Sequence, residues 1–363
     1  ASVVALVFVL LQAKKVMGFD EGTDLMKRIS QNVRKGAAAF LSRQYKTVAI
    51  FFICMVIIIC VMAALGLLTW YVPFAFLTGG LFSARPDSKY IASGKISPQF
   101  NPFGGEERFW VGPEGGPFSW FFKKGEEQVY SNWLVPKSID TEGFDIDECS
   151  TGKIVFSRKM SLRNASDVDF EIGVRRVVSL VEGANLEELL GIQIPQGVRT
   201  LAYRTDNTLT NLGNSAWTRE SGMPSVWLLG TFNPTPTTTV FIPYDKEFEG
   251  NPVKDDYFGR IPSDRLVVDD GFAYFKIDGK YRAKIGLPAG SARNLCGSFD
   301  SEKKILNILK FTVPSGDAPY VNSQWGPQDD PFRGDVINSY NDGPTETGVV
   351  MGPFYEIETS SPA

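Results

Sequence analysis

Two glutamates late in the sequence have the type and spacing that acid/base chemistry needs. Glu356 and Glu358 stand two residues apart in the segment FYEIE, whose alternation of apolar and acidic residues predicts a strand. Side chains two residues apart on a strand share one face, so both carboxyls would project together. An inward carboxylate must be desolvated or paired, and either condition shifts its pKa. We interpret Glu356 and Glu358 as candidate catalytic residues for work on a glycan.

Other charged, amide and aromatic side chains are candidates for holding a ligand. Carbohydrate sites stack aromatic rings against the sugar ring and fix its hydroxyls with charged planar groups. A compact loop region around Trp110 combines these types, and two more polar sets follow later in the chain. The predicted ligand-binding residues are Glu107, Arg108, Trp110, Glu114, Asp264, Arg265, Arg282, Asn341 and Asp342.

Each set also has a purely structural interpretation. An arginine–glutamate pair could hold the turn near Trp110, with Trp110 and Trp120 in the core. The charges of Asp264-Arg265, Arg282 and Lys284 could satisfy each other across adjacent strands, which contributes only about 0–1 kcal/mol when exposed. Both interpretations stay open at the level of sequence.

The composition excludes several kinds of site. The chain of 363 residues has no histidine, which excludes histidine zinc sites, Ser-His-Asp and Cys-His catalytic pairs, and the usual general base near neutral pH. There is no P-loop and no CxxC, and neither Asp255-Asp256 nor Asp329-Asp330 has EF-hand spacing, so we predict no metal site and no cofactor. Cys149 and Cys296 could form a disulfide, but two free, buried thiols are the preferred interpretation.

The charge divides the chain into two parts. Residues 1–84 carry 8 basic and 3 acidic residues, about +5, whereas the remainder carries 29 basic and 38 acidic residues, about −9. Because phosphate contacts need clustered lysine and arginine, the acidic part has no electrostatic reason to bind nucleic acid. We predict no nucleic-acid partner.

The acidic part, residues 85–363, is predicted to be mainly β. Runs rich in Val, Ile, Phe, Tyr and Thr predict strands, and clusters of Gly, Pro, Asn and Asp between them predict turns. One such cluster, residues 341–344, explains Asn341 and Asp342 without a function. Many strands without a βαβ rhythm predict a large antiparallel β-supersandwich. The clearest runs are 153–162, 169–180, 237–244 and 272–277, and the best helical candidate is 179–192.

The basic part, residues 1–84, has the pattern of membrane helices. Residues 48–68 are 21 consecutive residues without a charge, enough to span a bilayer, although a buried core helix is the alternative. The apolar runs 1–12 and 73–84 are too short to span, and we interpret them as a partial and a truncated helix. Residues 13–47 hold all eight basic residues, so the positive-inside rule predicts a cytoplasmic loop. The part after residue 85 would then lie outside the cytoplasm.

The basic part resembles a known family through GTDLMKRISQNVRKGAAAFLSRQYKT (22–47) and PFAFLTGGLFS. With these segments, residues 1–83 resemble the N-terminal helices of membrane-bound, ion-pumping pyrophosphatases. Members of that family chelate magnesium with Asp-rich motifs on later helices, and none of those motifs is present here. The resemblance therefore implies no pyrophosphate hydrolysis and no pumping by this chain alone, and magnesium only if the missing helices were supplied.

The acidic part resembles a second family, through GGEERFWVGPEGGPFSWFF (104–122), DDYFGRIPSDRL (255–266), GKYRAKIGL (279–287) and the segment 334–363. Residues 95–363 resemble an uncharacterised bacterial family with a galactose-mutarotase-like β-supersandwich. The wider superfamily includes aldose epimerases, polysaccharide-processing enzymes and proteins without known activity, so the resemblance implies a sugar ligand but no particular reaction. Mutarotases pair a histidine acid with a carboxylate base, and the absence of histidine argues against that mechanism.

These observations lead to one leading hypothesis and two alternatives. The leading hypothesis is an extracytoplasmic domain that binds or modifies carbohydrate, tethered to the cytoplasmic membrane with lipid and carbohydrate as partners. One alternative is a truncated pyrophosphatase, inactive by itself, joined to an unrelated domain, and the other is a non-enzymatic structural domain. The two resemblances meet at residues 84–94 and the chain opens with alanine, which favours a junction of two genes' pieces. If the junction is artefactual, the β domain is expected to be periplasmic or secreted.

Overall fold

The structure, a computed structural model, describes residues 61, 65, 97, 99–101, 105–314, 318–345 and 348–363. The chain divides into two compact units, residues 1–85 and 86–363. The segments predicted to be membrane helices lie outside the described residues except for Val61 and Leu65, where the Leu65 amide donates to the Val61 carbonyl at 2.9 Å. Among the described residues, no helix is both long enough and apolar enough to cross a membrane.

The described part of the second unit consists of strands joined by loops, with two short helices. The strands are β1 (Gly105–Gly112), β2 (Asp145–Ser150), β3 (Lys153–Arg163), β4 (Asp169–Leu180), β5 (Tyr203–Asn211), β6 (Ser225–Phe232), β7 (Thr238–Pro243), β8 (Leu266–Asp269), β9 (Phe272–Lys276), β10 (Ala283–Pro288), β11 (Leu295–Asp300), β12 (Ile305–Lys310), β13 (Asp335–Asn341) and β14 (Tyr355–Ser360). The helices are α5 (Lys137–Asp140) and α6 (Gly183–Leu190).

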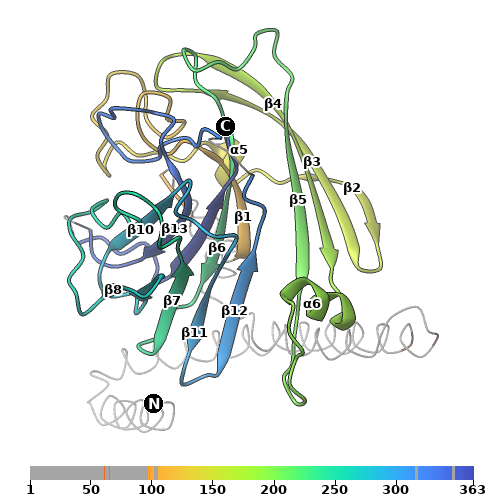
Figure 1. The fold of residues 1–363 in the computed structure, drawn as a ribbon. Coiled ribbons are helices and arrows are strands. Elements are labelled where there is room, and N and C mark those ends of the chain that lie inside the picture. The colour runs from red at the N-terminus through yellow and green to blue at the C-terminus, as the bar shows by residue number, and fades with distance from the viewer. Residues whose placement is uncertain are drawn as a thin grey trace, which may run out of the picture. The chain divides into compact units, whose positions relative to one another are not determined.

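These strands form three antiparallel sheets (Figure 1). The first sheet has the order β1-β6-β14-β13-β10, the second β12-β11-β7-β9-β8, and the third β2-β3-β4-β5. The predicted mainly β, antiparallel class is therefore confirmed.

The individual elements follow the local sequence patterns closely. β3, β4, β7 and β9 occupy the four runs predicted as strands, with bounds that differ by at most a residue. α6 lies within the predicted helical segment 179–192, whose first residues instead complete β4. It ends at Gly191, whose φ of 68° is the left-handed conformation that glycine adopts at a helix C-terminus.

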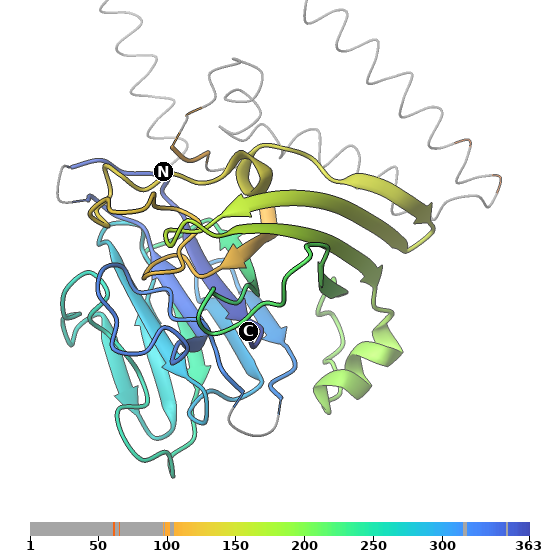
Figure 2. The ribbon, with the colours of Figure 1, turned by 90° about the horizontal axis from the view of Figure 1, so that it is seen from above.

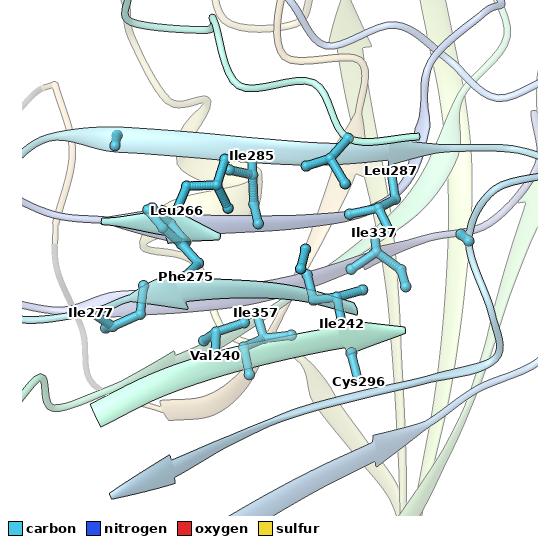
Figure 3. Close-up of a cluster of buried hydrophobic side chains, with 14 of the residues drawn as sticks. Val240, Ile242, Leu266, Phe275, Ile277, Ile285, Leu287, Cys296, Ile337 and Ile357 are labelled. Carbon is cyan, nitrogen blue, oxygen red and sulfur yellow. The ribbon is translucent and has the colours of Figure 1, made fainter. Parts of the chain in front are cut away.

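The first and second sheets enclose one hydrophobic core. Side chains from β10, β13 and β14 meet those from β7, β9 and β11, and Figure 3 shows Ile285, Ile337 and Ile357 close to Ile242 and Phe275. All five are fully buried. At about 1.5–3 kcal/mol for each large apolar side chain removed from water, this layer fixes the two sheets against each other.

The opposite face of the first sheet packs on a second, aromatic cluster. Residues of β1 and β6 contact the loop that follows β1, and the buried end of the third sheet closes the cluster with apolar side chains of β3 and β4. The third sheet curves beside the two-sheet sandwich in both views (Figures 1 and 2). The aromatic members of the cluster include Trp110, Trp120, Phe121, Trp133 and Trp227.

Both cysteines of this unit are free thiols. Cys296 on β11 is fully buried, and burial raises its pKa to about 12. Cys149 on β2 is exposed. The expectation of free, buried thiols is therefore right for Cys296 and wrong for Cys149, because β2 is an edge strand with every residue exposed.

Candidate functional site

The strand register of the first sheet brings charged and aromatic side chains together on the face away from the core. Glu356 lies opposite Thr231 on β6 and Tyr340 on β13, and Tyr340 lies opposite Lys284 on β10. One step along β14, Glu358 lies opposite Leu229 and Asn338. Because alternate residues of a strand face opposite ways, β14 directs Ile357 into the core and both glutamates to the other side.

Loops rise around this face to form a pocket that is open to solvent on one side. Trp110, Trp227, Lys284, Tyr340 and both glutamates form its floor, and Arg282 lies just before β10. The loops contribute mostly aromatic rings, so the pocket has the mixture typical of small-molecule sites: an apolar lining with a few convergent polar groups. The lining residues outside the strands are Phe100, Glu114, Tyr130, Trp133, Phe258, Arg282, Trp325, Met351 and Phe354.

A buried ion pair lies at the centre of the floor. Lys284 Nζ donates to Glu358 Oε2 at 2.9 Å, and Trp227 Nε1 donates to the same oxygen at 2.9 Å. The side chains of Glu358 and Lys284 are only 1% and 5% exposed. Burial lowers the pKa of Lys284, but the charges of Glu358 and Glu114 outweigh it, so the pKa is raised overall and the ammonium form is favoured.

Burial raises the pKa of the other two carboxyls of the pocket. Burial, followed by the charge of Glu358, raises the pKa of Glu356 to about 8, and Glu356 Oε1 accepts from Thr231 Oγ1 at 3.1 Å. Burial also raises the pKa of Glu114, although Lys284 lowers it. At neutral pH the pocket thus holds a protonated carboxyl, Glu356, two residues from a carboxylate paired with lysine, Glu358.

Four residues of the pocket have buried polar atoms without a hydrogen-bond partner in the protein. Three are donors, Trp110 Nε1, Trp133 Nε1 and Arg282 Nε, and one is an acceptor, Glu358 Oε1. An unsatisfied buried polar group costs about 1–3 kcal/mol. Four of the nine such atoms among the described residues belong to residues that line this one pocket, where a polar ligand would satisfy them.

Comparison with known proteins places this pocket in a defined family. A family model described as a family of unknown function, DUF6786, matches residues 87–363, most of the chain. The chain belongs to this family. The DUF6786 domain thus coincides with the second compact unit, and the pocket lies wholly within it.

The segment before the DUF6786 domain matches another family, described as inorganic H+ pyrophosphatase, over residues 3–88. A putative K(+)-stimulated pyrophosphate-energized sodium pump of Bacteroides thetaiotaomicron is 45% identical over 84 residues, 23% of this chain. A K(+)-insensitive pyrophosphate-energized proton pump of Caldanaerobacter subterraneus is 35% identical over 92 residues. The chain spans only 11% and 13% of the lengths of these two relatives.

Among solved structures, a galactose mutarotase-like protein from Lactobacillus casei is 12% identical, with a TM-score of 0.33, over 70% of this chain and 72% of that chain. Both resemblances stated from the sequence are therefore found again, the pyrophosphatase segment at the N-terminus and the family of unknown function after it.

Five of the residues predicted from sequence line the pocket of the DUF6786 domain. They are Trp110, Glu114, Arg282, Glu356 and Glu358. They come from β1, from the loop after it, from the segment before β10 and from β14. Trp110 fits both of its interpretations, because it is buried in the aromatic cluster and also faces the pocket.

Two more predicted residues support the lining without being part of it. Arg108 forms an ion pair with Asp140 at 2.8 Å, and its guanidinium lies 5.1 Å from the Trp110 ring centroid. Asp342 is fully buried; its Oδ1 accepts from Tyr340 Oη at 3.1 Å and its Oδ2 from the Gly352 amide at 2.7 Å. Arg108 therefore braces Trp110, and Asp342 orients Tyr340.

The remaining four predicted residues lie elsewhere. Glu107 pairs with Arg176 of β4 at 3.1 Å, and Asp264 is exposed. Arg265 forms a double hydrogen bond with Asp278, at 3.1 and 2.8 Å. Asn341 faces the other side of the sheet and holds the same turn, donating to the Tyr281 carbonyl at 3.0 Å.

Several residues of the pocket were not selected from the sequence. Lys284 was considered only as a partner of neighbouring charges, and Trp227, Tyr340 and Trp325 were not singled out. Lys284 and Arg282 share a face of one strand by their spacing of two, which is a signal that could have joined them. The aromatic residues had no such signal, since they come from strands and loops far apart in sequence.

Metal ligands are not gathered at the pocket. Across residues 105–314, 318–345 and 348–363, no group of three or more Cys, Asp or Glu side chains is arranged to hold an ion. The carboxyls of the pocket are instead separated by lysine and by aromatic rings.

Proposed function

We propose that the DUF6786 domain binds a carbohydrate in the pocket over β14 and its neighbours. The observation that carries the proposal is the set of buried, unpartnered donors and acceptors on Trp110, Trp133, Arg282 and Glu358, surrounded by aromatic rings. A sugar ring offers hydroxyl groups at its edge for such atoms and an apolar C–H face for the rings. A purely apolar ligand would leave these polar atoms unsatisfied.

The pocket also has the groups for a reaction on the bound sugar. Glu356 carries a proton at neutral pH because burial raises its pKa, and Glu358 is paired with Lys284. A proton donor and a carboxylate on one face are what general acid/base catalysis requires, and neither role needs a histidine. We propose Glu356 as the acid and Glu358 as the carboxylate partner of any such reaction.

Binding can be tested with the full chain in detergent against a panel of monosaccharides and short glycans, by calorimetry. Trp325→Ala removes a ring from the pocket wall, and we expect it to weaken saturable binding by about 2- to 10-fold, the value of one aromatic contact. Tyr274→Ala is the matched control, because Tyr274 is an aromatic residue 44% exposed on β9, outside the pocket. No saturable binding, or equal loss in both variants, would contradict the proposal.

A second proposal concerns residues 1–84 and rests on the match to the pyrophosphatase family. We propose that residues 48–68 span the cytoplasmic membrane, with lipid as partner and the DUF6786 domain on the outer side. The chain spans about a tenth of those pumps, so we expect no pyrophosphatase activity from it. Vesicles containing the full chain should show no magnesium-dependent pyrophosphate hydrolysis above an empty-vector control, and a protease added outside should reach the DUF6786 domain.

A further inference from the structure

Arg282 differs from every other arginine in the interior of the described part of the chain. Four buried or half-buried arginines there each pair with a carboxylate: Arg108 with Asp140, Arg158 with Glu142, Arg176 with Glu107, and Arg265 with Asp278. Arg282 is also half-buried, yet it forms no ion pair with a carboxylate of the described residues; its guanidinium donates to the hydroxyl of Tyr340, and its Nε is buried without a partner. A guanidinium taken out of water normally requires a counter-charge.

Two aromatic rings pack against the Arg282 guanidinium, and its Nε keeps no hydrogen-bond partner. Its central carbon lies 3.6 Å from the ring centroid of Phe258 and 5.9 Å from that of Trp325. Stacking fixes the plane of a guanidinium and leaves its in-plane N–H groups able to donate. Because Arg282 lines the pocket, a ligand bound there would lie next to this guanidinium.

The acidic side chains that interact with Arg282 through their charge are engaged with other groups. Asp342 accepts from Tyr340 and Gly352, and Glu114 lies 3.8 Å from Lys284 Nζ, while Glu358 is held by Lys284 and Trp227. None of the three forms an ion pair with Arg282, which leaves the place of a direct counter-charge to a ligand.

We infer that the ligand is an acidic sugar of the uronic acid class, whose carboxylate binds Arg282. This inference rests on the proposed carbohydrate pocket and adds the charge of its ligand. A planar carboxylate matches the parallel N–H groups of a guanidinium in a two-bond contact. A sugar phosphate offers the same contact but a charge near −2, and it would meet Glu358 and Glu114 in the same pocket, so the single charge of a carboxylate fits better.

The test uses calorimetry on the full chain in detergent with matched pairs of probes: glucuronate and glucose, galacturonate and galactose, and glucose 6-phosphate. We expect at least one uronate to bind about tenfold or more tightly than its neutral partner, as charge-assisted hydrogen bonds require, and more tightly than the phosphate. Arg282→Gln should abolish this preference, and Arg282→Lys should keep part of it. The matched control is Arg219→Gln, since Arg219 also stacks on a phenylalanine, Phe332 at 4.5 Å, but lies outside the pocket.

The outcomes separate the inference from the proposed function. Binding of neutral sugars without a preference for uronates would overturn the inference and leave the carbohydrate pocket standing. A preference that survives Arg282→Gln would also overturn it, because the carboxylate would then be bound elsewhere, and tighter binding of the phosphate would reassign the anion. No binding of any sugar would contradict the proposed function itself. The wild-type comparison alone decides the first and last of these outcomes, even if an Arg282 variant fails to fold.

Discussion

Removing the lysine of the buried pair, Lys284→Met, is expected to destabilise the DUF6786 domain strongly. Methionine keeps the length of the side chain but leaves the Glu358 carboxylate, 1% exposed, without its cation. The Trp227 bond at 2.9 Å would remain as its contact. Breaking a buried pair from one side costs about 3–5 kcal/mol, because the stranded charge has lost both water and partner.

The measurement is urea unfolding of the full chain at pH 7, followed by tryptophan fluorescence, with Lys153→Met as the control. Lys153 and Glu148 lie 3.0 Å apart, close to the 2.9 Å of the buried pair, but they are 41% and 51% exposed. Their separation should therefore cost only about 0–1 kcal/mol. Because the two pairs have nearly the same distance, the difference between the two losses of stability measures the effect of burial.

One further result is required by the same reasoning. The double variant Lys284→Met with Glu358→Gln should be more stable than Lys284→Met alone, because a buried glutamine has no charge that needs a partner. A loss no larger than that of Lys153→Met would refute the argument that this pair is a desolvated one.

Three other predictions concern single groups. The pKa of Glu356 is raised from 4.5 to about 8, so the folded state holds its proton more tightly than the unfolded chain. This stabilisation is fully present below about pH 4.5 and is lost as the pH rises to about 8. In thermal melting from pH 4 to 9, Glu356→Gln should therefore flatten the fall in stability over that range. Cys149 should react rapidly with a thiol reagent in the native domain while Cys296 reacts only after unfolding, and rapid modification of a Cys149→Ser variant at Cys296, mapped by mass spectrometry, would contradict its burial. Gly343→Ala should lower the free energy of unfolding, measured with urea, by about 1–3 kcal/mol, because a Cβ there would lie 2.4 Å from a main-chain nitrogen. Gly143→Ala, which has open space around it, should have little effect. Equal urea midpoints for the two variants would argue against the close approach at Gly343.

Much of the fold could be predicted from the sequence because its signals are local. The strands at 153–162 and 169–180 and the helix within 179–192 follow from the pattern of neighbouring residues alone. The exposure of Cys149 could not be predicted in this way, because it depends on β2 being the outer strand of its sheet. Strand order is a property of the whole chain and leaves no mark on a six-residue segment.

The candidate site shows the same division. Glu356 and Glu358 were found because their spacing of two puts them on one face of a strand. Their partners were not, since the bond from Trp227 to Glu358 joins residues 131 positions apart and that from Lys284 joins residues 74 apart. Arg265 was predicted from its residue type. Only its two hydrogen bonds to the Asp278 carboxylate show that it holds a turn instead of a ligand.

The place of β14 within its sheet sets the order in which the pocket can be made during synthesis. β1 pairs with β6, and β10 with β13, but these two ribbons are joined only by β14, which lies between β6 and β13. A nascent chain that has not yet left the ribosome as far as residue 360 therefore has two separate hairpin-like halves and neither of the paired glutamates between them. Until β14 arrives, β6 and β13 each keep an unpaired edge, so this domain is expected to depend on chaperones up to that point of synthesis.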